Sequence, residues 1–213
     1  KRLPAILPEL SYNEALEITK VYSVAGMLKE KEGIIGSRPF MSPHHTISSS
    51  ALVGGGRIPA PGQISLAHHG VLFLDELLEF KKDVLEVLRQ PLEDGEITIS
   101  RAQGSALFPC KFMLVASLNP CPCGFLGDSG HECTCTPNQI RRYLARISGP
   151  LLDRFDIHIE VPSLSFQKIS GNEKAESSSD IRERVNRARE IQVNRYKKDG
   201  IYYNSQLKPR QIR

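Results

Sequence analysis

The sequence has no long hydrophobic run, and its first residues show no signal-peptide pattern. No stretch approaches the roughly 20 consecutive apolar residues that a membrane-spanning helix needs. We therefore expect a cytoplasmic protein with no membrane partner. The chain has 213 residues, of which 40% are hydrophobic and 24% are charged. That is ordinary for a globular protein and is enough for one sizeable domain plus part of another.

The chain also has little excess charge, and that excess is unevenly placed. Residues 181–213 contain 10 Lys or Arg against 3 Asp or Glu, a net charge of +7, whereas the remainder contains 18 against 21, a net charge of −3. The body of the chain is therefore not a general basic patch, and its charge alone does not make it a nucleic-acid binder. A basic segment such as 181–213 is more often a solvated helix face than a nucleic-acid contact.

A third absence is the glycine-rich phosphate-binding loop G-x-x-x-x-G-K-[ST]. The one run of glycines, residues 54–56, is followed by Arg57, Ile58 and Pro59, with no Lys-Ser/Thr and with proline where a helix should start. This segment lacks the means to form the backbone cradle and lysine contact that hold the outer phosphates of a nucleotide.

Two carboxylates directly follow a short apolar run. Residues 71–74 are all apolar, and Asp75 and Glu76 come next. Such a run predicts a strand buried on both faces, as in a parallel sheet, with the acids emerging at its carboxyl end. Ligands bind at that edge of open parallel sheets. One carboxylate there can hold Mg²⁺ and the next can orient a water, although a strand that merely stops at two solvated acids is the plain alternative.

A second apolar run, residues 112–117, predicts a neighbouring strand that ends beside Asn119. A carboxamide at this edge can position an attacking water or hydrogen-bond a phosphate, and the alternative is a turn asparagine before proline. Between the two runs, residues 96–108 alternate, turn at 101–104 and return, which predicts a β-hairpin. Residues 156–161 alternate cleanly and predict the last strand of the sheet.

Four of the five cysteines lie within fifteen residues. Cys121, Cys123, Cys133 and Cys135 form two C-x-C pairs, a spacing that favours a closed, structural Zn²⁺ site over disulfides. His131 could replace one sulfur, and free thiols or a redox pair are the alternatives. Cys110 precedes a strand and is expected to pack. In the adjacent histidine pairs at 44–45 and 68–69, the two rings are expected on different faces, with roles in packing and loop hydrogen bonds rather than as a shared metal site.

Several segments together carry a family resemblance. The run at 71–76 is similar to the Walker B segment of an AAA+ ATPase. The segments SPHH at 42–45, ISLAHHG at 64–70 and LRQPLEDG at 88–95 resemble the magnesium-chelatase-like ComM/YifB family. The resemblance runs from residue 1 to roughly residue 165 and continues more weakly to the end. It implies an α/β fold with a mostly parallel sheet flanked by helices, a β-hairpin insertion and the start of a helical lid.

The resemblance also implies roles for single residues. Asp75 would hold Mg²⁺ with ATP, Glu76 would polarise the attacking water and Asn119 would position it. Arg154, in a segment similar to the family's arginine finger, would reach the nucleotide of a neighbouring subunit. An ion pair of Arg154 with Asp153 or Asp156 is the rival interpretation.

Partners follow from the resemblance in the same way. The chain would be part of a ring, a hexamer in this family, that uses ATP for DNA branch migration or helicase-type work in natural transformation. Arg57, in a loop similar to the family's helix-2 insertion, and Arg101, at the hairpin tip, are candidate DNA contacts. The rivals are a magnesium-chelatase I subunit that powers metal insertion into a porphyrin, and a non-catalytic zinc-bearing assembly module.

The family places a Walker A loop just before the residues that begin this chain. We therefore expect a fragment whose parent carries that loop upstream, and we expect the isolated fragment to bind ATP weakly or not at all. The expected domains are an ATPase core without its first strand at 1–166, a linker at 167–180 and the start of the lid at 181–213.

Overall fold

The computed structural model describes residues 2–28, 33–128, 130–162 and 175–199, together with 201, 204, 207 and 209–211. Its contacts divide the chain into two compact units. One unit comprises Ser11–Gly171, and the other comprises Lys1–Leu10 with Asn172–Arg213.

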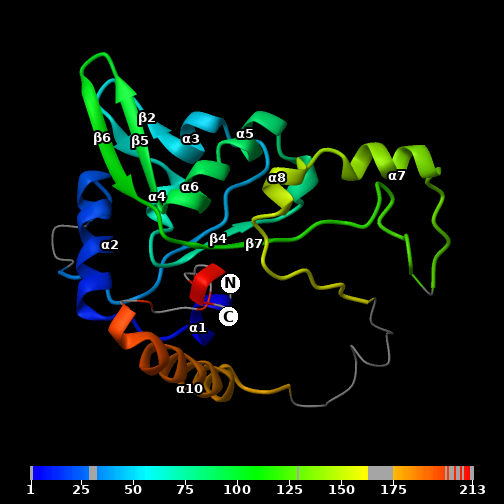
Figure 1. The fold of residues 1–213 in the computed structure, drawn as a ribbon. Helices are drawn as coiled ribbons and strands as arrows, with labels where there is room; N and C mark the ends of the chain where they lie inside the picture. The colour runs from blue at the N-terminus through cyan, green and yellow to red at the C-terminus, as the bar shows by residue number, and fades with distance from the viewer. Residues whose placement is uncertain are drawn as a thin grey trace. The chain divides into compact units, whose positions relative to one another are not determined.

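The larger unit is built on a three-stranded parallel sheet in the order β1-β4-β7 (Figure 1). Its strands are β1 (Phe40–Met41), β4 (Val71–Leu74) and β7 (Met113–Ala116). The central strand β4 is buried at three of its four positions, as a continuous apolar run predicts. The α/β class with a parallel sheet is therefore confirmed.

Eight short helices belong to the described part of this unit. They are α2 (Tyr12–Val24), α3 (Ser49–Val53), α4 (Gln63–Leu66), η1 (Leu77–Glu79), α5 (Lys82–Glu86), α6 (Arg89–Asp94), α7 (Pro137–Leu144) and α8 (Gly149–Leu152). Those from α3 to α6, together with α8, contribute residues to the core. α2 begins with a capping box in which the Ser11 side chain accepts from the backbone of Glu14 and the Glu14 side chain accepts from the backbone of Ser11. Leu72, Leu74, Leu88 and Leu151 are fully buried in the core that these elements share.

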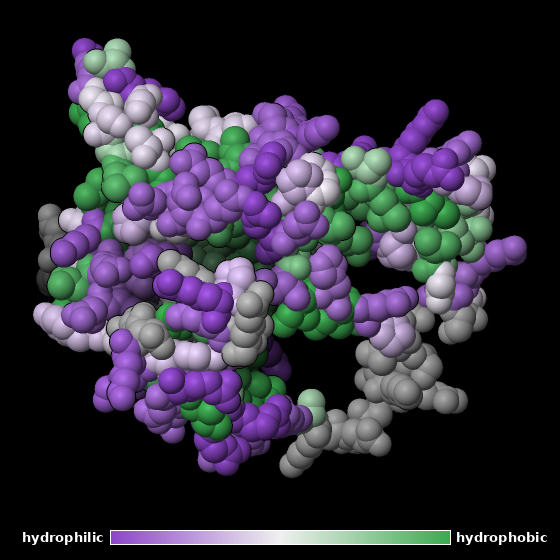
Figure 2. All heavy atoms as spheres, in the orientation of Figure 1, coloured by the Kyte–Doolittle hydropathy of each residue, from purple (hydrophilic) through white to green (hydrophobic). Residues whose placement is uncertain are grey.

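Two hairpins lie at one end of this unit. The predicted hairpin is present as β5 (Glu96–Arg101) paired with β6 (Gly104–Pro109), and it projects from the core in Figure 1. A smaller antiparallel pair, β2 (Gly54–Gly55) with β3 (Ala60–Pro61), interrupts the helical run between α3 and α4 and packs against β5. In Figure 2 the projecting hairpin ends in hydrophilic side chains.

The predicted last strand is wrong. Residues 156–161 form no strand, and Ile157, Ile159 and Val161 are 76%, 78% and 82% exposed. Alternating hydrophobicity gives a strand only where another strand offers free hydrogen-bonding groups. Among the described residues, no strand pairs with this segment.

The smaller unit contains α1 (Leu3–Ile6), which packs against α10 (Ser178–Tyr196), and the 3₁₀ turns η2 (Lys197–Asp199) and η4 (Pro209–Gln211). α10 is the predicted basic helix, and none of its described residues is buried. Much of the expected linker, residues 167–174, lies outside the described residues. Within the part that is described, no helix combines the length and apolar composition needed to cross a membrane.

Candidate functional site

The acid pair stands at the carboxyl end of the central strand. β4 ends at Leu74, and both Asp75 and Glu76 are exposed directly after it. The parallel register pairs Leu74 with Ala116 of β7, which brings the next residue, Ser117, alongside Asp75. The acids therefore leave the core where two parallel strands end together, the edge that binds ligands in open sheets.

Ser117 fixes the geometry of this edge. Its hydroxyl donates to Asp75 Oδ1 and accepts from the backbone N–H of Glu76 at 3.4 Å. The Ser117 carbonyl accepts from Leu77 N–H at 2.9 Å, and the Ser117 N–H donates to the Leu74 carbonyl at 3.0 Å. The residue that directly follows β7 thus holds both the carboxylate and the turn after it.

The backbone at Glu76 is unusual. Its φ of 52° and ψ of 50° lie in the left-handed region, which side chains other than glycine rarely adopt. The Glu76 N–H also donates to Asp75 Oδ1 at 3.1 Å. The side chain is 57% exposed, so the turn presents this carboxylate to solvent rather than to the core. Strained positions of this kind concentrate at functional sites.

His45 faces Glu76 from the segment after β1. Its Nδ1 lies 3.5 Å from Glu76 Oε2, and its ring meets the edge of Phe80 with centroids 6.4 Å apart. The His44 ring packs on His45 at 4.1 Å, and His44 Nδ1 lies 2.9 Å from the Thr46 hydroxyl. The expectation that the paired rings lie on different faces is wrong, because this pair is in a loop. The expected packing and loop hydrogen bonds are present.

The other two predicted catalytic residues are Asn119 and Arg154. Asn119 is exposed two residues beyond Ser117, and among the described residues it makes no hydrogen bond to either acid. Arg154 follows α8, and its guanidinium forms an ion pair with Glu93 of α6. The rival interpretation therefore has the wrong partner, since neither adjacent aspartate pairs with Arg154 in the described chain.

The two candidate DNA contacts lie close to one another. With its amide oriented to satisfy both neighbours, Gln103 accepts from Arg57 Nε at 2.8 Å and donates to the Arg57 carbonyl at 3.3 Å. The Arg101 guanidinium lies over Gly55, where an added Cβ would be 2.8 Å from Nη2. The turn between β2 and β3 and the tip of the β5–β6 hairpin therefore carry Arg57 and Arg101 on one joint surface.

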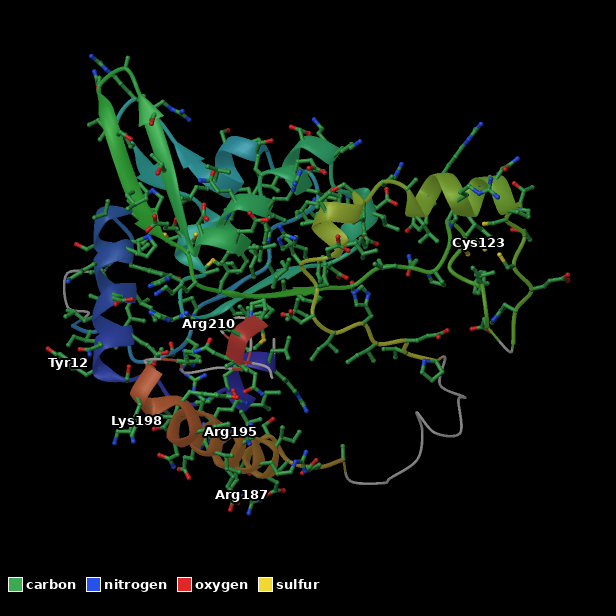
Figure 3. The ribbon with its side chains drawn as sticks, in the orientation of Figure 1. Tyr12, Cys123, Arg187, Arg195, Lys198 and Arg210 are labelled. Atoms are coloured by element: carbon green, nitrogen blue, oxygen red, sulfur yellow. The ribbon has the colours of Figure 1, made fainter. Side chains whose placement is uncertain are left out.

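The four clustered cysteines converge. The sulfur of Cys121 lies 3.3 Å from that of Cys123 and 3.7 Å from that of Cys133, and Cys123 and Cys133 are 3.6 Å apart. All four sulfurs, with Cys135, lie within 4.8 Å of one another, and none forms a disulfide. A zinc ion with bonds of about 2.3 Å would separate its sulfurs by roughly 3.8 Å. This donor set therefore fits one tetrahedral ion. Figure 3 shows Cys123 in the loop that leads to α7.

Neighbouring groups shift the pKa values of the clustered thiols in opposite directions. A backbone hydrogen bond from Phe125 lowers the pKa of Cys123, whereas burial and the neighbouring sulfurs raise the pKa of Cys135. A divalent cation would relieve that repulsion and favour all four thiolates.

His131 is not part of the cluster, because its ring stacks on Phe125 with the ring centroids 4.8 Å apart. Cys110 is buried, and burial raises its pKa to about 12, so it packs as expected.

A second group of potential ligands, Glu17, His68 and His69, does not fit a metal. The Lys111 N–H donates to His68 Nδ1 at 3.0 Å, so the ring hydrogen is on Nε2, which donates to Glu17 Oε2 at 3.0 Å. A metal on Nε2 would need a hydrogen on Nδ1, directed at the Lys111 N–H. His69 Nε2 lies 2.8 Å from the same carboxylate, and the two histidine rings pack at 3.9 Å. The group is therefore a hydrogen-bonded anchor between α2 and Lys111, two residues before β7.

Comparison with known proteins decides the family. The family model described as "Magnesium chelatase, subunit ChlI" matches residues 1–169. The chain belongs to the magnesium-chelatase family. Within it, the chain is 49% identical over 207 residues to the competence protein ComM of Haemophilus influenzae, covering 96% of this chain and 40% of ComM. It is 45% identical to YifB of Escherichia coli (strain K12), covering 96% of this chain and 40% of YifB.

Other relatives are more distant. The magnesium-chelatase subunit ChlI of Bigelowiella natans is 25% identical, with coverage of 54% of this chain and 25% of that protein. A structure of NtrX from Brucella abortus with ADP gives a TM-score of 0.38 at 18% identity, covering 58% of this chain and 24% of NtrX, a likeness too low to support an argument. The chain spans about 40% of the length of ComM and YifB.

Sequence reasoning missed three residues of this magnesium-chelatase-family site. Ser117 was counted as part of an apolar run, His45 was expected only to pack, and Gln103 was one residue of a turn. Each of these residues contacts a predicted site residue that lies far from it in the sequence, and only the fold brings the two together. One local signal was available: Ser117 directly follows a predicted parallel strand, and the residues after such strands stand at the ligand-binding edge of the sheet.

Proposed function

We propose that this chain is part of an ATP-hydrolysing AAA+ motor of the ComM/YifB type. The observation that carries the proposal is the edge where β4 and β7 end, with Asp75, Glu76 and Ser117 joined by hydrogen bonds. Two carboxylates fixed at this edge suit a hard cation and a water beside a nucleotide phosphate. Identity of 45–49% to YifB and ComM, against 25% to a chelatase subunit, favours this type over metal insertion into a porphyrin.

In this proposal each residue has one task. Asp75, oriented by the Ser117 hydroxyl, holds Mg²⁺, which when bound neutralises phosphate charge. Glu76, exposed on its strained turn, accepts a hydrogen bond from the attacking water and polarises it. Asn119, exposed beyond the end of β7, positions that water. The alternative is a non-catalytic assembly module, which would be favoured if the variants described below hydrolysed ATP at the full rate.

The role of Asp75 can be tested through the divalent cation. In the intact protein, Asp75→Asn should raise the Mg²⁺ concentration needed for half-maximal ATP hydrolysis by at least about tenfold, because a neutral amide binds Mg²⁺ less tightly than a carboxylate. The matched control is Asp156→Asn, an exposed aspartate after Arg154 and Phe155. If Asp75→Asn has the same Mg²⁺ dependence as the control, Asp75 does not hold the ion.

We further propose that the intact protein forms a ring, a hexamer, with ATP between subunits and Arg154 acting on the neighbour's nucleotide. The lid would begin at residues 181–213 and the core would occupy 1–166. Arg154 is one-third exposed, and its pairing with Glu93 holds the guanidinium near the surface. In a ring, Arg154 would exchange Glu93 for a phosphate, which a guanidinium can contact bidentately.

DNA is the proposed substrate, for branch-migration or helicase-type work. Support comes from the likeness to ComM, and from Arg57 and Arg101, which lie on one surface of the two hairpins. ATP hydrolysis by the intact protein should be stimulated by DNA, and Arg101→Gln should reduce that stimulation while leaving the DNA-free rate unchanged. If DNA does not change the rate of ATP hydrolysis, the alternative of metal insertion into a porphyrin is favoured. Binding of the intact protein to other chelatase subunits would support that alternative.

The cysteine cluster is proposed to hold one structural Zn²⁺ through Cys121, Cys123, Cys133 and Cys135. The support is the approach of the four sulfurs to tetrahedral spacing. Elemental analysis of the purified protein should give one zinc per chain, and Cys123→Ser should lose it. The control Cys110→Ala removes a cysteine outside the cluster and should keep the zinc. Zinc-free protein with four titratable thiols in the cluster would contradict the assignment.

A further inference from the structure

A hollow of about 470 Å³ is lined by the segment η1–α5 and by residues of α7 and the turn after it. Four of its lining side chains are cationic, namely Lys81, Lys82, Arg142 and Arg146, and one, Glu79, is anionic. Figure 1 places α7 beyond α5 and α8 on the same side of this unit. The proposed catalytic roles use none of these five residues.

Arg146 is held in place and cancels the one negative charge. Its Nη1 donates to the Leu78 carbonyl at 2.7 Å and lies 3.3 Å from Glu79 Oε2. The contact with a backbone carbonyl fixes this side chain against η1. Since Glu79 is paired with Arg146, the remaining three cations give the hollow its net positive charge.

Nearby carboxylates are engaged away from the hollow. Asp83 accepts from the Ser49 hydroxyl at 2.8 Å, and Glu86 pairs with Arg89 at 3.3 Å. These contacts direct two acids that follow Lys82 toward other elements. Among the described residues, neither of these α5 carboxylates forms an ion pair with Lys81 or Lys82.

The cations themselves have few partners. Within the described part of the chain, neither Lys81 nor Arg142 forms an ion pair, and Lys82 acts on Glu86 only electrostatically from one helical turn away. All three side chains are exposed. Residues 1–180 have a net charge of −3, so a concentration of unpaired cations here is a local departure from the charge of the body. Unpaired like charges around one hollow repel each other unless an anion joins them.

We propose that this hollow binds an anion with two or more phosphates, either successive phosphates of a single nucleic-acid strand or the triphosphate of a nucleotide. The Arg142 guanidinium suits bidentate contact with a phosphate, and the lysines supply point charges on the opposite wall. The volume is large enough for more than one phosphate group. Binding here requires neither Asp75 nor Glu76, so it does not depend on ATP hydrolysis.

The test uses the intact protein and two probes: a fluorescein-labelled single-stranded oligonucleotide and inorganic triphosphate. The test variant is Lys81→Gln with Arg142→Gln. The matched control is Arg141→Gln, which makes the same change one residue earlier on α7, at an exposed side chain that does not line the hollow. Both positions are exposed, so the urea unfolding midpoint should stay that of the wild type.

We expect the double variant to bind at least one probe about tenfold more weakly and the control to stay within about twofold of the wild type. If the oligonucleotide is the ligand, removing two phosphate contacts should reduce the slope of log K against log salt by about 1.4. A loss confined to triphosphate would identify the nucleotide as the source. Equal losses in the control, or no loss with either probe, would overturn the proposal. Glu76→Gln should leave the binding unchanged, which separates this test from that of hydrolysis.

Discussion

The side chain of Ser117 holds Asp75 and the backbone of Glu76 at the same time. At the scale of single residues, Ser117→Ala should therefore lower the rate of ATP hydrolysis about tenfold to a hundredfold, since a hydrogen bond to a charged group contributes about 1.5–3 kcal/mol. The site is near the surface, so stability should change little. Steady-state kinetics of the intact protein would measure this, and Ser117→Thr, which keeps the hydroxyl, should retain most of the activity. Equal rates for the alanine variant and the wild type would show that this bond is dispensable.

The left-handed turn at Glu76 predicts a conflict between stability and function. A non-glycine residue in this conformation costs about 1–2 kcal/mol, and glycine avoids that cost but loses about 0.5–1 kcal/mol in chain entropy. Glu76→Gly should therefore be about 0.5–1 kcal/mol more stable than Glu76→Gln, although neither should hydrolyse ATP. Urea unfolding of the two variants would measure the difference. A less stable glycine variant would mean that the turn carries no strain.

His68 predicts a pH dependence of stability. Burial lowers the pKa of His68 to about 4, whereas the unfolded value is 6.5. Between pH 6.5 and pH 4 the unfolded chain therefore binds a proton at His68 that the folded chain does not bind. The free energy of unfolding falls as the pH drops through this range. The loss between pH 7.5 and pH 5 should be on the order of 2 kcal/mol. Hydrogen bonds from His69 and His68 lower the pKa of Glu17, which acts in the same direction but at lower pH.

The matched variant is His68→Asn, whose carbonyl oxygen can still accept from the Lys111 N–H but whose side chain does not titrate. Its free energy of unfolding should change much less between pH 7.5 and pH 5. If wild type and variant lose the same stability over this range, another group is responsible.

At the scale of elements, the β2–β3 hairpin between α3 and α4 requires two backbone segments to pass very close to each other. A Cβ on Gly62 would lie 2.4 Å from Gly54 N and 2.6 Å from the Leu52 carbonyl oxygen, so the two arms of the insertion touch through glycine. Gly62→Ala should destabilise the protein by about 1–3 kcal/mol, the usual cost of overpacking. Gly36→Ala is the control, because nothing lies within 4 Å of its added Cβ. Thermal or urea unfolding would compare the two, and equal stability would show that the crossing relaxes freely.

The elements also show what the sequence could predict. The run at 71–74 and the alternation at 96–108 gave β4 and the hairpin correctly, because burial on two faces and hairpin turns leave local patterns. The capping boxes that begin α2 at Ser11 and α7 at Thr136 join residues three apart in the chain, so they too are local features. The segment 156–161 has an equally clear alternation but lacks a described partner strand, and pairing is not a local property.

The candidate site was predictable in part for the same reason. The position of Asp75 and Glu76 at a strand end followed from the apolar run. The contacts of Glu76 with Ser117 and His45, and of Arg154 with Glu93, join residues far apart in the chain. Only the fold brings them together, and no periodicity in the sequence indicates them.

At the scale of the whole molecule, the chain spans about 40% of the length of ComM and YifB, so the proposed function is that of the intact protein. Its central claim is that Glu76, held out on a strained turn beside Asp75, polarises the water that attacks ATP. The pairing of Arg154 with Glu93 and the cationic hollow next to η1 are separate features, and neither is needed for this claim.

The most direct test is ATP hydrolysis by the intact Glu76→Gln variant, measured together with its nucleotide affinity. The account predicts a rate at least about 100-fold below that of the wild type, because a general base contributes that much or more, with an affinity for ATP within about threefold of the wild type. The control Glu96→Gln, at an exposed glutamate that begins β5, should behave as the wild type. A Glu76→Gln protein that hydrolyses ATP at the full rate would contradict the account.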